Sequence, residues 1–370
     1  MSARVFVGLS GGVDSSLACA LLVEQGYDVT AIYMRNWSRD LPGFRCPWAN
    51  DLADAERVAV TVGCDLLVWD FEKEYKSTVV DYLVDSYRRG WTPNPDVMCN
   101  QTVKFGAFAE RAFAQGADLI ATGHYARTRQ LASGATELLR AKDEHKDQTY
   151  FLWRVPGETF KRVLFPVGDF ANKKEVRAAC AARGLGVEGK PDSDGICFVG
   201  PVGIRTFLLD SLKQRAGDIV EWETGRVLGR HDGAFLFTVG QRRGLDLGGG
   251  PARYVVDVDT KANIVYVTSD PQSPALWTDR LQLADAHWLS RKVPAAGRYL
   301  VRSRHTGKLR EALVKPDGTS SVEVILPQAM KRVACGQSAV IYDGEVCLGG
   351  GIVCGPEPVR QPATPLPWEK

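Results

Sequence analysis

The chain has 370 residues, of which 45% are hydrophobic and 24% charged. At about 150 residues per domain, this length predicts two or three domains, each with its own core. With 37 Gly, 19 Pro and 9 Cys, the composition excludes a low-complexity, collagen-like or disulfide-rich chain. The net charge of +2 neither requires nor excludes a nucleic-acid partner, because a local basic patch is enough to bind one.

No apolar run approaches the ~18 residues that a membrane span needs. The first residues lead directly into a strand-like run and show no leader character. We therefore expect a cytoplasmic protein with no membrane association. In that reducing compartment most of the cysteines should be buried thiols. No C-x₂₋₄-C pair occurs, which disfavours a zinc ribbon, and we predict no protein-held metal site.

The first third of the chain alternates predicted strands and helices. Strands are expected at residues 5–9, 29–34, 66–69 and 118–122, and helices around residues 17–22, 51–62, 74–88 and 104–114. The strands are nearly continuous apolar runs, which is typical of a parallel sheet covered by helices on both faces. The predicted fold class is therefore α/β, with a doubly wound sheet that binds ligands at the carboxyl ends of its strands.

After about residue 200 the pattern changes to short β-type runs separated by turn signals. The turns are expected at residues 231–233, 259–263, 316–318 and 342–344. Strands spaced by about 8–12 residues with such turns predict two small, mostly β, barrel-like domains. We expect domains at 1–202, 203–274 and 275–356, followed by a Pro-rich tail at 357–370.

A Gly- and Ser-rich loop joins the first predicted strand to the first helix. There a helix N-terminus offers free N–H groups and a positive dipole end to an anion. Gly11 and Gly12 permit a tight turn, Ser10 and Ser15 add hydroxyl donors, and Asp14 is suited to hold Mg²⁺ against phosphates. The loop has neither the P-loop ending nor the G-x-G-x-x-G spacing. Its residues are Gly8, Leu9, Ser10, Gly11, Gly12, Val13, Asp14 and Ser15.

Two cysteines lie on polar segments far apart in the sequence. Pro93, Asn94 and Pro95 exclude a helix, so Cys99 is expected on or beside a rigid loop. Cys197 ends a polar, Gly-bearing stretch that starts at Gly189. Thiols in such settings are placed for reactivity rather than for packing. The other seven cysteines are expected to be structural, including Cys46, which is the only other loop candidate.

The loop at 8–15 looks like the S-G-G-x-D-S loop of the PP-loop ATPases, the N-type ATP pyrophosphatases. With the other motifs, the chain resembles the tRNA-specific 2-thiouridylases over roughly residues 4–354. The motifs are residues 92–100, 104–106, 121–126, 146–152, 190–198, 238–245 and 344–352. Residues 40–50 depart mildly from the family pattern, which puts only the local loop structure in doubt.

This resemblance implies an enzyme that replaces oxygen by sulfur at C2 of the wobble uridine of tRNA. It implies ATP as co-substrate, with Cys99 as nucleophile and Cys197 as the persulfide carrier. The implied ATP contacts are Gly8–Ser15, Met34 and Gly123. The implied contacts with the target base are Asn94, Pro95 and Asp96. Further implied tRNA contacts are His124, Lys146, Asp147, Gln148, Arg304, His305 and Gln337. We also expect a persulfide sulfur-donor protein as partner, and a monomer.

Some roles remain open from the residues alone. Cys99 either releases sulfide from the persulfide or attacks C2 itself. Asp96 either carries a proton or caps the loop. His124 either faces the substrate or is a core histidine, and the basic run 302–310 either binds tRNA or forms a solvated strand face. Two other functions compete, an amide-forming PP-loop ligase and a non-catalytic tRNA-binding relative.

Overall fold

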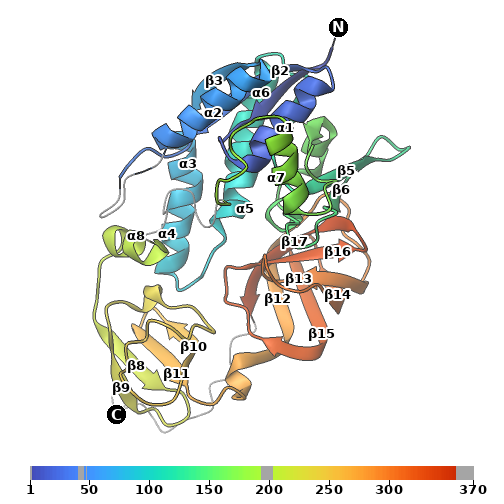
Figure 1. Ribbon diagram of the computed structural model, residues 1–370. Coiled ribbons are helices and arrows are strands. Elements are labelled where there is room, and N and C mark those ends of the chain that lie inside the picture. Colours follow the sequence, from blue (N-terminus) through green and yellow to red (C-terminus); the bar gives the residue numbers. More distant parts are fainter. Residues whose placement is uncertain (1, 41–45, 47, 193–202, 356–370) are drawn as a thin grey trace.

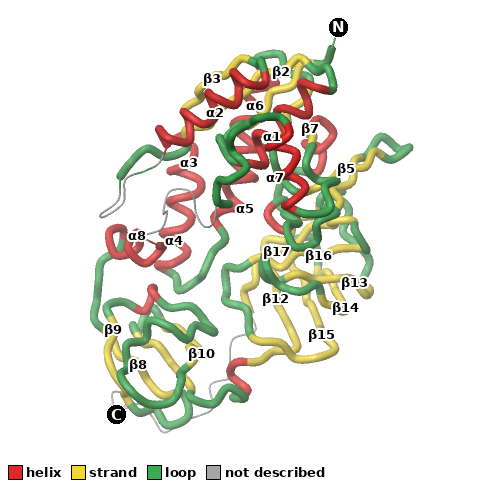
Figure 2. The backbone as a smooth tube through the Cα atoms, in the orientation of Figure 1, coloured by secondary structure: helices red, strands yellow, loops and turns green. Residues whose placement is uncertain are grey.

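The computed structural model describes residues 2–40, 46, 48–192 and 203–355. Figure 1 shows a helix-covered sheet above two β-rich parts, and Figure 2 shows most helices in the upper half of the molecule. The upper sheet has five strands in the order β3-β2-β1-β4-β7, and every neighbouring pair is parallel. Its strands are β1 (Arg4–Gly8), β2 (Asp28–Arg35), β3 (Asp65–Asp70), β4 (Leu119–Ala121) and β7 (Val163–Leu164). The predicted parallel sheet is confirmed.

Helices cover both faces of this sheet because successive side chains of a strand point to opposite sides. Val5 and Val7 of β1 lie in one core, whereas Phe6 lies in the other. The first core is covered by α1 (Val13–Glu24), α2 (Trp48–Val62) and α7 (Lys173–Ala182). The second is covered by α3 (Glu72–Tyr75), η1 (Lys76–Val80), α4 (Asp81–Arg88), α5 (Pro95–Cys99), η2 (Asn100–Ala107) and α6 (Phe108–Ala114). This is the doubly wound arrangement predicted.

The C-terminal strands form a closed antiparallel barrel. Its six strands are β12 (Trp277–Trp288), β13 (Gly297–Arg302), β14 (Arg310–Asp317), β15 (Ser321–Lys331), β16 (Ser338–Asp343) and β17 (Val346–Gly355). Pairing of β12 with β17 closes the ring. A hairpin from the first half of the chain, β5 (Ala126–Gln130) and β6 (Thr136–Arg140), extends the same sheet through β17. The sequence analysis assigned no strands to these residues. The hairpin connects the α/β layer to the barrel.

The chain between these two parts forms a smaller sheet, with the strand order β10-β11-β8-β9. Its strands are β8 (Gly217–Glu221), β9 (Val227–His231), β10 (Tyr254–Asp259) and β11 (Ile264–Thr268), preceded by α8 (Gly203–Ser211). The buried Arg332 of the segment after β15 joins it to the barrel. Its Nη1 donates to the carbonyl of Val256 at 2.9 Å and to that of Ala275 at 3.2 Å.

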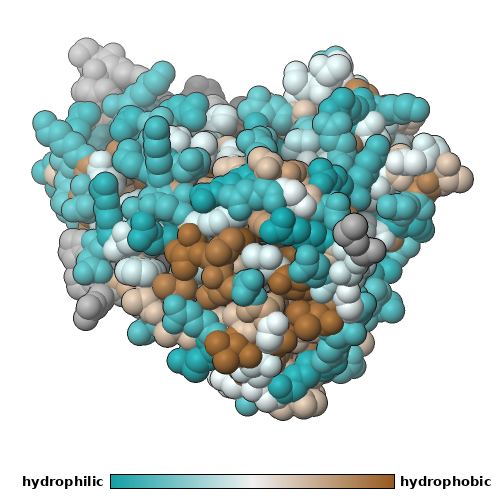
Figure 3. All heavy atoms as spheres, turned by 90° about the horizontal axis from the view of Figure 1, so that it is seen from above, coloured by the Kyte–Doolittle hydropathy of each residue, from teal (hydrophilic) through white to brown (hydrophobic). Residues whose placement is uncertain are grey.

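Strand β3 is an edge of the parallel sheet and carries exposed apolar side chains. Leu67 and Val68 are exposed, as is Val60 near the end of α2. The view from above shows apolar side chains gathered among polar ones (Figure 3). None of the residues predicted for the functional site lies on this strand.

Within the described residues, no helix combines the length and the apolar character that crossing a membrane requires.

Candidate active site

The loop at residues 8–15 joins β1 to α1 and is held by its own serines. Ser15 Oγ accepts from the Ser10 amide at 3.2 Å, lies 3.0 Å from Ser10 Oγ, and donates to the Gly12 carbonyl. Gly11 has φ +72°, and a Cβ there would lie 2.4 Å from the Asp51 carbonyl oxygen. The N-cap of α1 is Gly12, which has no side chain, so no capping side chain competes with an anion for the first amides of the helix.

The other residues predicted to contact ATP pack directly against this loop. A Cβ on Gly8 would lie 2.9 Å from Met34 Cε, and one on Gly123 would lie 2.5 Å from the Ser15 amide nitrogen. Glycine is therefore needed at position 123, where the near atoms are backbone, whereas at position 8 the near atom is the end of the flexible Met34 side chain. The fold thus brings Met34 and Gly123 to the loop, although they come from β2 and from the segment after β4.

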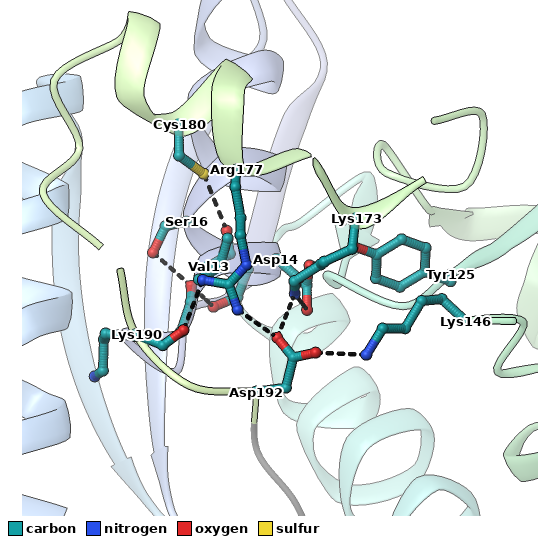
Figure 4. Close-up of polar contacts among 12 residues, drawn as sticks. Val13, Asp14, Ser16, Tyr125, Lys146, Lys173, Arg177, Cys180, Lys190 and Asp192 are labelled. Carbon is teal, nitrogen blue, oxygen red and sulfur yellow. Dashed lines mark hydrogen bonds and ion pairs between the residues drawn. The ribbon is translucent and has the colours of Figure 1, made fainter. Parts of the chain in front are cut away.

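Asp14, in the first turn of α1, is engaged by two side chains from other elements (Figure 4). Lys173 Nζ, at the start of α7, lies 2.7 Å from both carboxylate oxygens. The Tyr125 hydroxyl donates to Asp14 Oδ1 at 2.7 Å. Burial, together with the negative charge of Asp14, raises the pKa of Tyr125, so this hydroxyl stays protonated and donates. Helix α7 is fixed against the loop by Cys180, whose thiol donates to the Val13 carbonyl.

Asp192 gathers three cations on the same side of the loop (Figure 4). Lys173 lies 3.0 Å and Arg177 lies 2.9 Å from its Oδ1, while Lys146 pairs with its Oδ2. Burial opposes ionisation of Asp192, but the bonds from Lys146 and Lys173 outweigh it and lower the pKa to about 2. Lys173 is thus shared between Asp14 and Asp192.

Lys190 holds the loop from its other side. Its Nζ donates to the Gly11 carbonyl at 3.1 Å and to Asp51 Oδ1 at 3.2 Å, and it also pairs with Asp54. Both carboxylates belong to α2. Lys190 therefore links the nucleotide loop, α2 and the segment that leads to Asp192.

Cys99 is the last residue of helix α5, not part of a loop. Pro95 occupies the first helical turn, where the missing N–H of proline costs nothing, and Asn94 caps the helix by accepting from the Asp96 amide at 3.2 Å. The sequence analysis was wrong to read the two prolines as excluding a helix. The capping role considered for Asp96 belongs to Asn94. Cys99 is buried, with 6% of its surface exposed.

Cys197 lies outside the described residues, so its approach to Cys99 stays a prediction. Burial raises the pKa of Asp96, and the nearby positive charge of Lys104 opposes this rise. A raised pKa favours proton exchange nearer neutral pH, as the proton-carrier role requires. Lys104, in η2, lies in one of the family motifs, but the sequence analysis predicted no role for it. Its positive charge favours the ionised form of the Asp96 carboxyl.

His124 is buried between aromatic rings and follows Gly123 directly. Its Nδ1 lies 2.8 Å from Thr122 Oγ1, and its ring centroid lies 5.7 Å from that of Phe105. Burial, and then the charge of Lys104, lowers the pKa of His124 well below its ordinary value, so the ring is neutral. The charge of Lys104 thus affects the pKa of both Asp96 and His124.

The three neighbours Lys146, Asp147 and Gln148 have different surroundings. Lys146 is half-buried on Asp192, as described above. The carboxylate of Asp147 is buried and lies 2.9 Å from Arg302 Nη1. Gln148 Oε1 accepts from the Tyr125 amide at 2.9 Å. The tRNA contacts predicted for these residues stay predictions, and Asp147 additionally holds the barrel strand β13 to this segment.

The basic run 302–310 is not one strand. Residues 303–309 form the turn between β13 and β14, because the chain reverses there. In this turn the His305 ring lies 4.3 Å from the Phe151 ring, and Arg304 donates to the Arg332 carbonyl at 3.2 Å. Gln337 donates to the Thr92 carbonyl at 2.7 Å, next to the segment that caps α5. The barrel residues predicted for tRNA thus border the Cys99 segment.

The chain matches three known protein families, one after another along its length. Residues 3–201 match the family described as "tRNA methyl transferase HUP domain". Residues 205–269 match "tRNA methyl transferase PRC-barrel domain", and residues 278–353 match "Aminomethyltransferase beta-barrel domain". A Bacillus velezensis protein named "tRNA-specific 2-thiouridylase MnmA" is 42% identical over 354 residues, covering 95% of this chain and 94% of that protein. The chain belongs to the family of tRNA-specific 2-thiouridylases.

A second relative supports the same assignment. An Idiomarina loihiensis protein with that name is also 42% identical, over 95% of this chain and 96% of that protein. Among solved structures, "Crystal structure of a 4-thiouridine synthetase - RNA complex with bound ATP" gives 20% identity and a TM-score of 0.33. It covers 54% of this chain and 45% of that chain. The resemblance inferred from the motifs is confirmed by the two close relatives.

The sequence analysis missed the polar partners of Asp14. Tyr125 and Asp192 lie in the family motifs but were predicted no role, and Lys173 was not singled out. A local signal marked the start of α7, since Asn172 caps it and Glu175 follows three residues later. No local pattern connects Lys173 with Asp14, because 159 positions separate them.

Proposed function

We propose that the chain catalyses ATP-dependent 2-thiolation of the wobble uridine of tRNA, with release of AMP and pyrophosphate. The observation that supports the proposal is that residues near the nucleotide loop and residues near Cys99 share the electrostatic influence of one cation. Gly123 touches Ser15, His124 follows it, and Lys104 acts on both His124 and Asp96. Asp96 stands three residues before Cys99 on the same short helix.

The first step activates the base. A uridine C2 carbonyl is a poor electrophile with a poor leaving oxygen, so transfer of AMP from ATP onto that oxygen makes it a leaving group. The first amides of α1 and the hydroxyls of Ser10 and Ser15 are suited to bind the phosphates of ATP. The α-phosphate bonds to the base oxygen, and pyrophosphate leaves.

Within the described residues no three His, Cys, Asp or Glu side chains gather closely enough to hold a metal. Mg²⁺ that is bound to a triphosphate commonly takes one or two carboxylates together with phosphate oxygens and water. Asp14 is the carboxylate that would hold it. Bound there, Mg²⁺ would neutralise charge on the phosphates.

The second step delivers sulfur. A donor protein would transfer a sulfane sulfur to Cys197, forming a persulfide. In one route the Cys99 thiolate attacks the inner sulfur of this persulfide, which releases sulfide and closes a Cys99–Cys197 disulfide. The sulfide then displaces AMP from C2. In the other route Cys99 attacks C2 itself and displaces AMP. The terminal sulfur of the Cys197 persulfide then attacks C2 and releases the Cys99 thiolate, which attacks the Cys197 sulfur, frees the 2-thiouridine and closes the same disulfide. Asp96 would carry the proton in either route.

The substrate must be held so that the wobble base reaches this site. The barrel turn with Arg304 and His305, together with Gln337 beside Thr92, offers a surface next to α5. A base splayed out of the anticodon loop would meet Asn94, Pro95 and Asp96, while the phosphates meet basic side chains. We also propose three domains, at residues 1–202, 203–274 and 275–356, because the chain forms three separate sheets.

The test is to follow pyrophosphate release and the mass of the wobble nucleoside with full-length protein, ATP, tRNA and a persulfide donor. Asp14→Ala should abolish pyrophosphate release while the protein stays folded. Cys197→Ser should lose the added sulfur mass on its peptide, and Cys99→Ser should accept sulfur on Cys197 but fail to deliver it. Cys354→Ser, in β17, is the control and should remain active.

Full activity in either Cys99→Ser or Cys197→Ser would exclude this chemistry and favour an amide-forming ligase. Absence of ATP-dependent pyrophosphate release in the wild type would favour a non-catalytic tRNA-binding protein.

A further inference from the structure

Lys173 has an unusual environment for a lysine that only stabilises the fold. Its side chain is largely buried, with 13% exposed, and its ammonium faces three carboxylate oxygens, two on Asp14 and one on Asp192. The Tyr125 ring lies 5.7 Å from Nζ on another side. All three N–H donors of the ammonium are therefore directed at anionic oxygens at the nucleotide loop.

We infer that Lys173 is the ammonium that binds the phosphate chain of the nucleotide, and that Asp192 competes with the phosphates for it. This inference rests on the proposed function, since it requires that the loop at 8–15 binds ATP. Asp14 belongs to that loop, so the ammonium already lies within hydrogen-bond distance of the element on which the phosphates would sit. A bound triphosphate would offer it more negative charge than either carboxylate.

Two of the neighbouring cations, Arg177 and Lys190, also bond to backbone carbonyls. Arg177 donates through Nη1 to the carbonyls of Glu188 and Lys190, so its guanidinium is bound to the backbone. Lys190 donates to the Gly11 carbonyl and to two carboxylates of α2. By contrast, the hydrogen bonds and the ion pair described for Lys173 go to the side-chain carboxylates of Asp14 and Asp192 and not to backbone carbonyls.

The fold fixes the backbone of Lys173 rather than its ammonium group. It is the first residue of α7, Asn172 caps that helix, and Cys180 bonds the helix to Val13 of the loop. The backbone is therefore anchored while the long side chain reaches toward Asp14.

The experiment measures equilibrium binding of three probes to the full-length protein by calorimetry: ATP, inorganic pyrophosphate and adenosine. A charge-assisted hydrogen bond supports an affinity change of about tenfold or more. Lys173→Met should therefore weaken ATP and pyrophosphate by at least that factor and leave adenosine unchanged. Lys174→Met is the matched control, because Lys174 is the exposed next residue of α7 and should bind all probes normally.

Two further variants separate a phosphate contact from simple neutralisation of Asp14. If Lys173 only neutralises Asp14, then Lys173→Met should cost nothing in an Asp14→Asn background, which would overturn the inference. A phosphate contact predicts that the loss persists in that background. Asp192→Asn should change affinity in the opposite direction and tighten pyrophosphate binding, because it removes the competing carboxylate. Weaker pyrophosphate binding in Asp192→Asn would contradict the competition.

The outcomes distinguish the two levels of the proposal. Wild-type protein that binds neither ATP nor pyrophosphate would overturn the proposed function together with the role of Lys173. Wild-type binding with unchanged affinity in Lys173→Met would overturn only the role of Lys173. Lys173→Arg, which retains the charge, should recover part of the affinity. Thermal unfolding of each variant confirms that a loss of binding is not a loss of folding.

Discussion

Gly123 is the position at which a single methyl group should disturb the nucleotide loop most directly. In Gly123→Ala the new Cβ would lie 2.5 Å from the Ser15 amide nitrogen, 2.6 Å from the Asp14 carbonyl carbon and 2.8 Å from Ser15 Cα. All three atoms are backbone, so no flexible side chain can move aside. Relief of the clash requires the start of α1 and the segment after β4 to separate by roughly 1 Å.

The size of the effect follows from this displacement. Overpacking of a well-packed interior costs about 1–3 kcal/mol of unfolding free energy. A shift of about 1 Å at a positioning element can reduce turnover on the order of 100-fold. We therefore expect Gly123→Ala to lose pyrophosphate release by about that factor while the protein still folds, because α1 would no longer hold the loop amides in place.

The assay compares urea unfolding and ATP-dependent pyrophosphate release with those of Gly249→Ala. A Cβ added at Gly249 would meet no heavy atom within 4 Å, and the φ of Gly249 lies outside the left-handed region, so alanine there should change neither quantity. Wild-type stability together with wild-type turnover in Gly123→Ala would refute the packing argument. A stability loss without a turnover loss would show that the loop tolerates the displacement.

Three further predictions concern charged residues. Arg302→Met removes the 2.9 Å partner of the buried Asp147 carboxylate, although Arg140 Nε still lies 3.5 Å from the same oxygen. The variant should lower the unfolding free energy by about 1.5–3 kcal/mol, whereas the exposed Arg298→Met on the same strand should not. Asp192 has a depressed pKa, so its contribution to stability is present above about pH 4 and is lost as the pH falls toward about 2; Asp192→Asn should show a smaller loss of melting temperature over that interval. Arg304→Ala should weaken tRNA binding and reduce its salt slope by about one unit without changing ATP affinity, and an unchanged slope would assign the turn no phosphate contact.

The sequence alone determined the parts of this protein that are encoded locally. Continuous apolar runs separated by helical segments predicted the parallel sheet, and turn residues at regular spacing predicted the β-rich second half. The Gly- and Ser-rich loop could be placed between β1 and α1 because strand, turn and helix are contiguous there. The family was also recognisable, since its motifs are short runs that keep their order along the chain.

One local prediction was wrong for a local reason. Two prolines around Asn94 were read as excluding a helix, although proline is favoured in the first turn and asparagine at the cap. The same residues that interrupt a helix in its interior begin one at its N-terminus. Whether a segment starts or breaks a helix depends on what packs beyond it, and here the buried Val97 and Cys99 join the core beneath the sheet.

Only the tertiary structure decided which distant residues meet. Lys173 reaches Asp14 because α7 packs on α1, and β6 pairs with β17 across the whole second half of the chain. Such contacts leave no periodicity or spacing in the sequence, because they depend on the relative placement of complete elements and not on neighbouring residues. A charged side chain in one helix is compatible with many partners, and the packing of the surrounding elements selects the one that it finds.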